Sequence, residues 1–287
     1  MLALVFAGCS KQEETSKTTE PAEKAAEEKK GTVELAYVEW SSEVASTNVV
    51  MAVLQEKMGY DVEITPVSAA AMWQSVASGD SDGLVAAWLP TTHGHYLEKL
   101  KEDVVDLGPN LTGTKIGLVV PSYVEIDSIA KMEENAEKFD GKIIGIDPGA
   151  GIMSKTEKVL EDYALESFEL VSGSGATMTA ALADAIKNEE WIAVTGWTPH
   201  WKFAKWDLKY LDDPKGTYGG EEAIHTIVRK GLKEDMPEVY AFLDNFEWTP
   251  DEMAELMVWN QEEDSDPYET AKRWIEENPE KVNAWLP

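Results

Sequence analysis

The 287-residue chain has little of the chemistry that covalent or redox sites need. A single cysteine, Cys9, excludes an intrachain disulfide bond. No serine lies in a Gly-x-Ser-x-Gly elbow, the strained turn that exposes a nucleophilic hydroxyl. Only four histidines are available: His93, His95, His200 and His225. The sequence therefore marks no nucleophile for covalent catalysis, and we predict no catalytic residue and no enzyme activity.

Basic residues are also scarce. Lys and Arg total 25 against 54 Asp and Glu, which gives a formal net charge of −29. A chain this acidic is repelled by phosphate backbones and by anionic lipid surfaces. Nucleic acid is therefore excluded as a partner, and we interpret the acidity mainly as a contribution to solubility.

Long apolar runs are missing, since no stretch approaches the ~20 residues that span a bilayer as a helix. Residues 1–9 are small and apolar and end in Phe6-Ala7-Gly8-Cys9. This is typical of the end of a signal peptide. The Ala-Gly-Cys order resembles the lipobox of bacterial lipoproteins, which implies lipidation of Cys9. The usual basic region is absent and Phe6 stands where Leu is common, so we interpret residues 1–9 as a truncated signal peptide.

The segment after Cys9 has a composition typical of disorder. Residues 11–31 contain no aromatic and no β-branched aliphatic side chain. Such a segment buries too little apolar surface to offset its conformational entropy. We predict that residues 10–32 are a disordered tether between an acyl anchor on Cys9 and a fold that begins at residue 33.

What the rest of the chain does contain is a repeated alternation of strand and helix patterns. The first block has predicted strands at 33–38, 62–67 and 83–88 and predicted helices at 46–58 and 72–77. The second block has predicted strands at 142–146, 168–171 and 191–195 and predicted helices at 153–163 and 178–186. This βαβαβ order favours an α/β fold in which each block is a mainly parallel sheet flanked by helices.

The two blocks end alike. Trp88-Leu89-Pro90 closes the first and Trp197-Thr198-Pro199 closes the second, with the tryptophans 109 positions apart (197 minus 88). We therefore predict two similar lobes, each with a Trp-x-Pro loop beyond the carboxyl end of its third strand. Ligands of open α/β sheets bind at those ends, so both loops are expected to meet in one cleft.

Apolar strands at 116–121 and 224–228 are predicted to cross between the lobes and form a hinge. The helical pattern of residues 237–287 is expected to pack on the first lobe. The predicted domain organisation is then lobe 1 from 33–117 and 225–287, and lobe 2 from 118–224.

Tryptophan is abundant, with 11 residues. Trp40 follows the first predicted strand and enters a polar stretch, Ser41 to Glu43, that we interpret as a loop. With Trp88 and Trp197 it completes a set of three indoles at strand ends. A desolvated cation over an indole gains about 2 kcal/mol or more, so three such faces favour a trimethylammonium group. The other tryptophans are interpreted as packing residues: Trp73, Trp191, Trp201, Trp206, Trp248, Trp259, Trp274 and Trp285.

Two short motifs have weaker meanings. Gly149-Ala150-Gly151 lies between a predicted strand and a predicted helix, where bare backbone N–H groups attract an anion such as a carboxylate. It lacks the third Gly, the Lys and the Ser/Thr of phosphate-binding loops, so no nucleotide cofactor is predicted. His93-Gly94-His95 lacks placed partner ligands, so no metal is predicted.

Four segments together resemble the glycine-betaine-binding lipoproteins of bacterial ABC importers. They are 37–40 (Tyr-Val-Glu-Trp), 87–93, 145–153 and 195–201. The resemblance implies a two-lobed periplasmic-binding-protein fold, type II-like, that closes over its ligand. It implies a prism of Trp40, Trp88 and Trp197 around the trimethylammonium group. It also implies that the backbone N–H groups of Gly151 and Ile152 and the side chain of His93 hold the carboxylate.

The same resemblance implies partners and location. We expect a monomer that needs no cofactor, is lipid-anchored to the outer face of the bacterial cell membrane and delivers an osmoprotectant to an ABC permease. Proline betaine, carnitine and choline are alternative ligands, although choline has no carboxylate for His93. A carbohydrate-active enzyme is a remote alternative, because it needs two carboxylates flanking a bond. Glu39, Glu43 and Asp147 lie near the predicted loops without a visible pairing.

Overall fold

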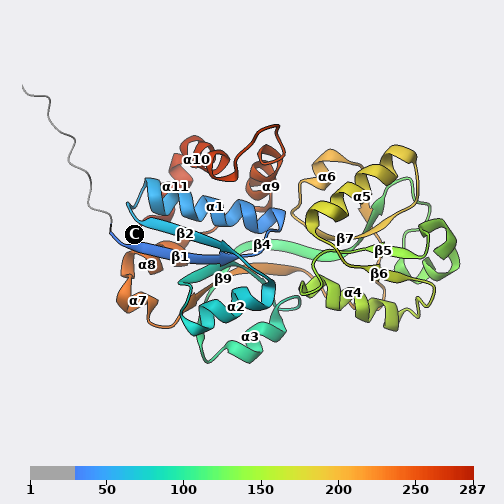
Figure 1. Cartoon of the computed structure of the whole chain (residues 1–287), viewed down its shortest axis with the longest axis horizontal. Coiled ribbons are helices and arrows are strands. Elements are labelled where there is room, and N and C mark those ends of the chain that lie inside the picture. Colours follow the sequence, from blue (N-terminus) through green and yellow to red (C-terminus); the bar gives the residue numbers. More distant parts are fainter. Residues whose placement is uncertain (1–29) are drawn as a thin grey trace, which may run out of the picture.

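In a computed structural model of the chain, residues 30–287 are described. The predicted signal peptide, Cys9 and nearly all of the predicted tether lie outside the described residues. Two α/β lobes lie side by side along the long axis of the molecule, joined by long strands that run across the middle (Figure 1). This architecture confirms the predicted two-lobed α/β fold.

Lobe 1 begins with the predicted βαβαβ unit. Its three strands form a parallel sheet in the order β2-β1-β3. The elements are β1 (Thr32–Tyr37), α1 (Ser41–Glu56), β2 (Asp61–Pro66), α2 (Ala69–Ser78) and β3 (Gly83–Leu89). α1 begins five residues before the predicted start, because its first turn is polar and yet buried, which hides it from a pattern based on apolar residues.

Lobe 2 repeats the unit with the same strand order, β6-β5-β7, again parallel. The elements are β5 (Lys142–Ile144), α4 (Gly151–Asp162), β6 (Glu169–Val171), α5 (Gly175–Asn188) and β7 (Ala193–Thr198). Ser174 caps α5 by accepting the backbone N–H of Thr177. The internal repeat seen in the sequence is therefore a structural repeat.

Two antiparallel strands connect the lobes. β9 (Glu222–Arg229) pairs with β3 on one side and with the first part of β4 (Val104–Pro121) on the other. β4 then pairs with β7 from Lys115 onward, and with β8 (Leu208–Tyr210). The strand predicted at 116–121 thus extends much further back, through Gly108, Pro109 and Gly113, whose register shifts disguise it as a loop. The lobe boundaries at 117/118 and 224/225 stay a prediction.

The C-terminal helices pack on lobe 1 as predicted, with α9 and α10 covering α1. They are α8 (Pro237–Asn245), α9 (Pro250–Trp259), α10 (Pro267–Glu277) and α11 (Pro279–Trp285). Each begins with Pro, whose fixed φ suits the first helical position. Trp274 and Trp285 stack with ring centroids 6.0 Å apart and are fully buried, which agrees with their interpretation as packing residues.

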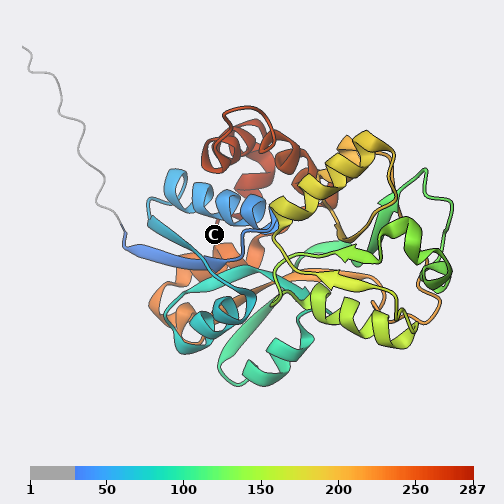
Figure 2. The ribbon, with the colours of Figure 1, turned by 45° about the vertical axis from the view of Figure 1, so that its right-hand side comes forward.

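Short helices complete the fold. They are α3 (Gly94–Leu100), η1 (Ile129–Lys131), η2 (Glu133–Phe139), α6 (Lys202–Lys205) and α7 (Leu232–Asp235). The view turned by 45° shows α4 on one face of the lobe 2 sheet and α5 on the other (Figure 2).

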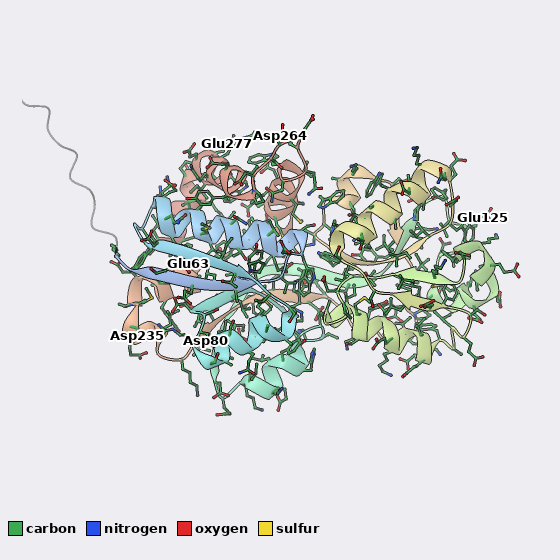
Figure 3. The ribbon with its side chains drawn as sticks, viewed as in Figure 1. Glu63, Asp80, Glu125, Asp235, Asp264 and Glu277 are labelled. Carbon is green, nitrogen blue, oxygen red and sulfur yellow. The ribbon has the colours of Figure 1, made fainter. Side chains whose placement is uncertain are left out.

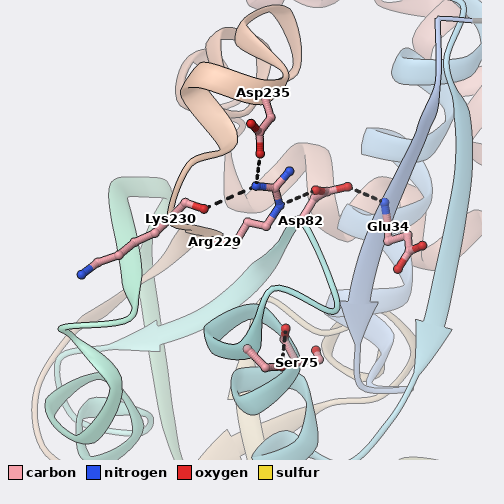
Figure 4. Close-up of polar contacts among 7 residues, drawn as sticks. Glu34, Ser75, Asp82, Arg229, Lys230 and Asp235 are labelled. Carbon is pink, nitrogen blue, oxygen red and sulfur yellow. Dashed lines mark hydrogen bonds and ion pairs between the residues drawn. The ribbon is translucent and has the colours of Figure 1, made fainter.

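An ion-pair network fixes the lobe 1 sheet at the end of β1 away from the other lobe (Figure 4). Arg229, the last residue of β9, donates to Asp82 through Nε at 2.8 Å and to Asp235 through Nη1 at 2.7 Å. The second oxygen of Asp82 accepts the backbone N–H of Glu34 at 2.9 Å. Because Asp82 precedes β3 and Glu34 lies in β1, one guanidinium ties β9, β3 and β1 together.

Candidate functional site

A small cavity lies between the lobes, at the carboxyl ends of the parallel strands. Its lining includes all six residues that the sequence predicted for the ligand site. The complete lining is Trp40, Ser42, Glu43, Trp88, Thr92, His93, Ile116, Ile146, Ala150, Gly151, Ile152 and Trp197. Residues more than 150 positions apart in the chain thus share one small, mostly apolar space.

Trp88 and Trp197 occupy equivalent places in β3 and β7. The Trp-x-Pro loops predicted beyond those strands were wrong. Trp197 lies inside β7, past the predicted strand end at 195, and pairs with Ile116 of β4. Trp88, the last residue of the predicted strand 83–88, lies inside β3 and pairs with Ile224 of β9. The following prolines suggested an earlier strand end, but the ladders continue to Leu89 and Thr198. Both X-Pro bonds are cis. Anchored in strands, the two indoles are buried, with 3% and 4% of their surfaces exposed.

Trp40 is the N-cap residue of α1, and its carbonyl accepts the backbone N–H of Val44 at 2.8 Å. The predicted loop from Ser41 to Glu43 was also wrong, because these residues form the first turn of the helix. The turn directs Ser42 and Glu43 to the cavity, where both are fully buried. Glu43 was named from the sequence only as one of three carboxylates near the predicted loops, so its place among the tryptophans was missed.

Each of the three indole N–H groups donates a hydrogen bond to a side chain in or beside the cavity. Trp88 Nε1 donates to Glu43 Oε1 at 2.7 Å, and Ser42 Oγ donates to the other oxygen of the same carboxylate. Trp197 Nε1 donates to Ser42 Oγ at 3.2 Å. Trp40 Nε1 donates to Asp147 Oδ2 at 3.2 Å. The rings are therefore held by their edges, and their π faces need no further polar partner.

Glu43 is a buried carboxylate without a basic partner among residues 30–287. Burial raises its pKa to about 7, while the hydrogen bonds from Ser42 and Trp88 favour the charged form. Both carboxylate oxygens accept hydrogen bonds, which suits the ionised state. A negative charge in this position makes the cavity attractive to a cation.

An anion-binding pole lies opposite, at the N-terminus of α4. Neither Gly151 nor Ile152 has an acceptor for its backbone N–H among the described residues. Ala150, the N-cap residue, has no side-chain oxygen to supply one. Free N–H groups and the positive end of the helix dipole favour a carboxylate here.

His93 supplies a further donor. It is fully buried, and its Nδ1 accepts the backbone N–H of Trp88 at 3.1 Å. Burial lowers the pKa of His93 to about 3, so the ring is neutral and its proton resides on Nε2. Nε2 has no partner in the described structure. A buried, unpaired N–H costs free energy, so a ligand that offers Nε2–H an acceptor would bind favourably here. The ring also stacks on Trp40, with centroids 5.8 Å apart.

The lobes are closed on one another. Trp201 Nε1 donates to Ser41 Oγ at 3.1 Å, and the Tyr96 hydroxyl donates to the Gly149 carbonyl at 3.3 Å. At Gly151, an added Cβ would lie 2.4 Å from the Thr92 carbonyl oxygen of the opposite lobe. Only glycine permits this approach, so the residue at the anion pole is also the point where the two lobes fit together.

Glu222, a residue that the sequence did not indicate, holds the loop between Trp88 and His93. Its Oε1 accepts the backbone N–H groups of Thr91 and Thr92, each at 2.7 Å, and its Oε2 accepts the Thr92 hydroxyl. Glu222 is buried at the first position of β9, where the chain returns to lobe 1. The connecting strand therefore supports the ligand loop directly.

Many carboxylates lie on the outer surface, whereas the cavity is lined by one, Glu43. Figure 3 labels six exposed carboxylates that point outward from both lobes. Glu43 is the single carboxylate that lines the cavity within residues 30–287, and Glu39 is exposed outside it. The pair of carboxylates that sugar cleavage needs is therefore not present in the cavity.

No group of three or more His, Cys, Asp or Glu in the described part of the chain is arranged to hold a metal ion. Within residues 30–287, no helix has the length and apolar character to cross a membrane.

Known proteins are similar to this chain in sequence and in architecture. Residues 31–277 match the family described as the substrate binding domain of ABC-type glycine betaine transport system. A glycine betaine/carnitine transport binding protein, GbuC of Listeria monocytogenes, is 52% identical over 151 residues, which are 52% of this chain and 50% of that protein. The chain thus aligns with half the length of this curated relative.

Two solved structures extend the likeness over nearly the whole chain. Lactococcal OpuAC, closed and complexed with glycine betaine, has a TM-score of 0.85 and 47% identity, covering 90% of this chain and 100% of that one. A choline-binding protein of an ABC transporter, in complex with choline, has a TM-score of 0.83 and 28% identity, covering 88% and 91%.

Proposed function

The chain belongs to the family of substrate-binding domains of ABC-type glycine betaine transport systems, and we propose that it captures glycine betaine between its lobes for delivery to a permease. The observation that carries the proposal is the pairing of two opposite poles in one cavity. Trp40, Trp88 and Trp197 with Glu43 form a pole for a cation, and the start of α4 with His93 forms a pole for a carboxylate.

The cation pole suits a quaternary ammonium group. Its methyl groups carry the positive charge and donate no strong hydrogen bonds, so aromatic faces bind them better than hydrogen-bond acceptors do. The indole N–H groups are already satisfied by Glu43, Ser42 and Asp147, which leaves the faces for the ligand. A primary ammonium would lose its hydration without gaining enough acceptors.

The carboxylate pole orients the zwitterion. The unpaired N–H groups of Gly151, Ile152 and His93 Nε2 are the donors that a carboxylate would satisfy. Because Trp40, Trp88 and His93 belong to lobe 1 while Trp197 and Gly151 belong to lobe 2, a bound ligand contacts both lobes. Such a ligand binds the closed state better than the open one and shifts the population toward it.

Choline, carnitine and proline betaine are the competing ligands. Choline would fill the cation pole but leave the three donors of the carboxylate pole unpaired, which costs free energy. Carnitine and proline betaine keep both charges but are larger. The likeness to a choline-binding protein, at 28% identity, makes choline the comparison to test.

A calorimetric titration series separates the two poles. We expect glycine betaine to bind more tightly than choline, which lacks the carboxylate. The carbon isostere of glycine betaine, 3,3-dimethylbutanoate, has the carboxylate but no cation. It is expected to bind more weakly than glycine betaine by about 2 kcal/mol or more. Equal affinities for glycine betaine and the isostere would show that the tryptophans do not select a cation, and no binding of any betaine would contradict the proposed function.

Substrate-binding proteins of ABC importers act outside the cytoplasm. We further propose that a lipid on Cys9 holds this chain at the outer face of the membrane and that it works as a monomer. Cys9→Ala in the full chain is expected to move the protein from the membrane fraction to the soluble fraction, with Ser10→Ala as the matched control. Cys9→Ala protein that stays with the membrane would contradict the lipid anchor.

A further inference from the structure

Behind the ligand cavity lies a lysine that the proposed function does not use. Lys202, the first residue of α6, is fully buried, the only lysine of residues 30–287 in that state. Its Nζ makes no hydrogen bond and no ion pair in the described structure. Burying an unpaired ammonium is costly, so its presence here needs an explanation.

The π face of Trp197 is the partner that Lys202 does have. Nζ lies 4.6 Å from the centroid of the Trp197 ring and 5.6 Å from that of Phe203. Trp197 lines the cavity, whereas Lys202 does not. The amine therefore sits on the side of the indole that faces away from the cavity. Gly196 lies beside the amine: a Cβ there would clash with Val119 at 2.3 Å and would be in ordinary contact with Nζ at 3.5 Å.

No counter-charge among residues 30–287 offsets this amine. The titratable group nearest in the chain is His200, whose Nδ1 accepts the Lys202 backbone N–H at 3.1 Å. Burial lowers the pKa of His200 well below its usual value, so this ring is neutral. Tyr210, which stacks on Phe203, is also uncharged, because burial raises its pKa. Val119 of β4 and Gly196 and Trp197 of β7 lie beside this amine, and none of them is titratable.

We propose that Lys202 sets the cation affinity of the cavity, because its ammonium occupies one π face of Trp197 while the ligand's cation uses the other. Two cations on opposite faces of one ring compete for the same π electrons and repel each other through a medium of low dielectric constant. The charged lysine therefore weakens ligand binding, and the neutral amine restores it. This inference rests on the proposed binding of a quaternary ammonium ligand.

The side chain of Lys202 changes its charge within the physiological range of pH. Burial lowers its pKa to about 7. A cation in the cavity would lower this pKa further, so binding near neutral pH releases a proton from Lys202. Affinity is therefore expected to rise as the pH rises through about 7 and to level off above it. Ionisation of Glu43, whose pKa burial raises to about 7, acts in the same direction. Variants are needed to separate the two groups.

Titration calorimetry with glycine betaine at pH 6 and pH 9 tests the proposal on Lys202→Met, which keeps the length of the side chain and removes its charge. The variant is expected to bind roughly tenfold more tightly than the native protein at pH 6 and equally at pH 9. Lys205→Met is the matched control, because Lys205 is exposed on the same helix and lies over Trp206 and Trp201 instead. It should behave as the native protein at both pH values.

Two results would overturn the inference: the same affinity ratio at both pH values, or weaker binding by Lys202→Met at both. A second measurement does not depend on the folding of that variant. Glu43→Gln protein, titrated at pH 7 in buffers of different ionisation enthalpy, should still release protons on binding glycine betaine, and no release would contradict a role for Lys202. Native protein that gives no binding heat would instead contradict the proposed function itself.

Discussion

The two lobes place the same residue at the same point of the same motif, yet surround it with opposite charges. Trp88 of lobe 1 and Trp197 of lobe 2 are the next-to-last residues of equivalent strands in a repeated βαβαβ unit. Trp88 donates its indole N–H to the carboxylate of Glu43, whereas Trp197 has the amine of Lys202 against its ring. The repeat thus explains why two indoles face one cavity, but their neighbours determine how strongly each attracts a cation.

The largest effect is expected from removing the lobe 1 tryptophan. Trp88→Ala should weaken glycine betaine binding by at least about 2 kcal/mol, because it removes a π face and one of the two hydrogen-bond donors to Glu43. Trp197→Ala should cost less, since it also removes the ring that the ligand shares with Lys202. Calorimetry on both variants checks the order, with Trp259→Ala as a control, because Trp259 does not line the cavity. Unchanged affinity in Trp88→Ala would refute the aromatic cage.

The fit between the lobes is tested at Gly151. Gly151→Ala places a methyl group against the Thr92 carbonyl, so the closed state should lose about 1–3 kcal/mol, the usual cost of overpacking. Gly149→Ala is the matched control, because nothing lies within 4 Å of its Cβ position. Small-angle scattering with and without ligand should show closure in the control and reduced closure in Gly151→Ala. Equal closure in both would argue against Gly151 as the contact point.

His93 is expected to affect the affinity for ligands with a carboxylate more than the affinity for ligands without one. His93→Ala should weaken glycine betaine binding by about 1.5–3 kcal/mol, the range for a hydrogen bond to a charged group, and barely change choline binding. Competition titrations with both ligands measure the difference. If the two affinities fall by the same factor, His93 acts by supporting Trp40 and not by holding the carboxylate.

The smallest effect is expected from neutralising Glu43. Its folded-state pKa of about 7 lies above its ordinary value of 4.5, so its contribution to stability is present below pH 4.5 and is lost as the pH rises through 7. Ligand-free Glu43→Gln should therefore gain thermal stability relative to the native protein as the pH increases over this window, while losing affinity severalfold above it. A constant stability difference from pH 4 to pH 8 would show that Glu43 does not titrate as described.

Much of this comparison was visible in the sequence. The spacing of Trp88 and Trp197 predicted the structural repeat, and apolar periodicity located most helices and strands. Apolar periodicity did not detect the polar first turn of α1. Ser42 and Glu43 are buried there through contacts with Trp197 of lobe 2 and Trp88 of β3. The first half of β4 escaped it because Gly and Pro residues normally end a strand.

The predicted ligand residues shared one cavity, but their supporting groups were not foreseen. Glu43, Glu222 and Lys202 act through partners that are 45, 130 and 5 positions away in the chain. Sequence patterns report which residue types are unusual, such as tryptophan at strand ends. They do not report which buried charge lies behind each ring, since that is decided by tertiary packing.

The orientation of the ligand is the central claim, and a crystal structure of residues 30–287 with glycine betaine tests it most directly. The account predicts the trimethylammonium group among Trp40, Trp88 and Trp197. It predicts the carboxylate on the N–H groups of Gly151 and Ile152 and on His93 Nε2. A ligand bound in the reverse orientation, or outside the cavity, would contradict it.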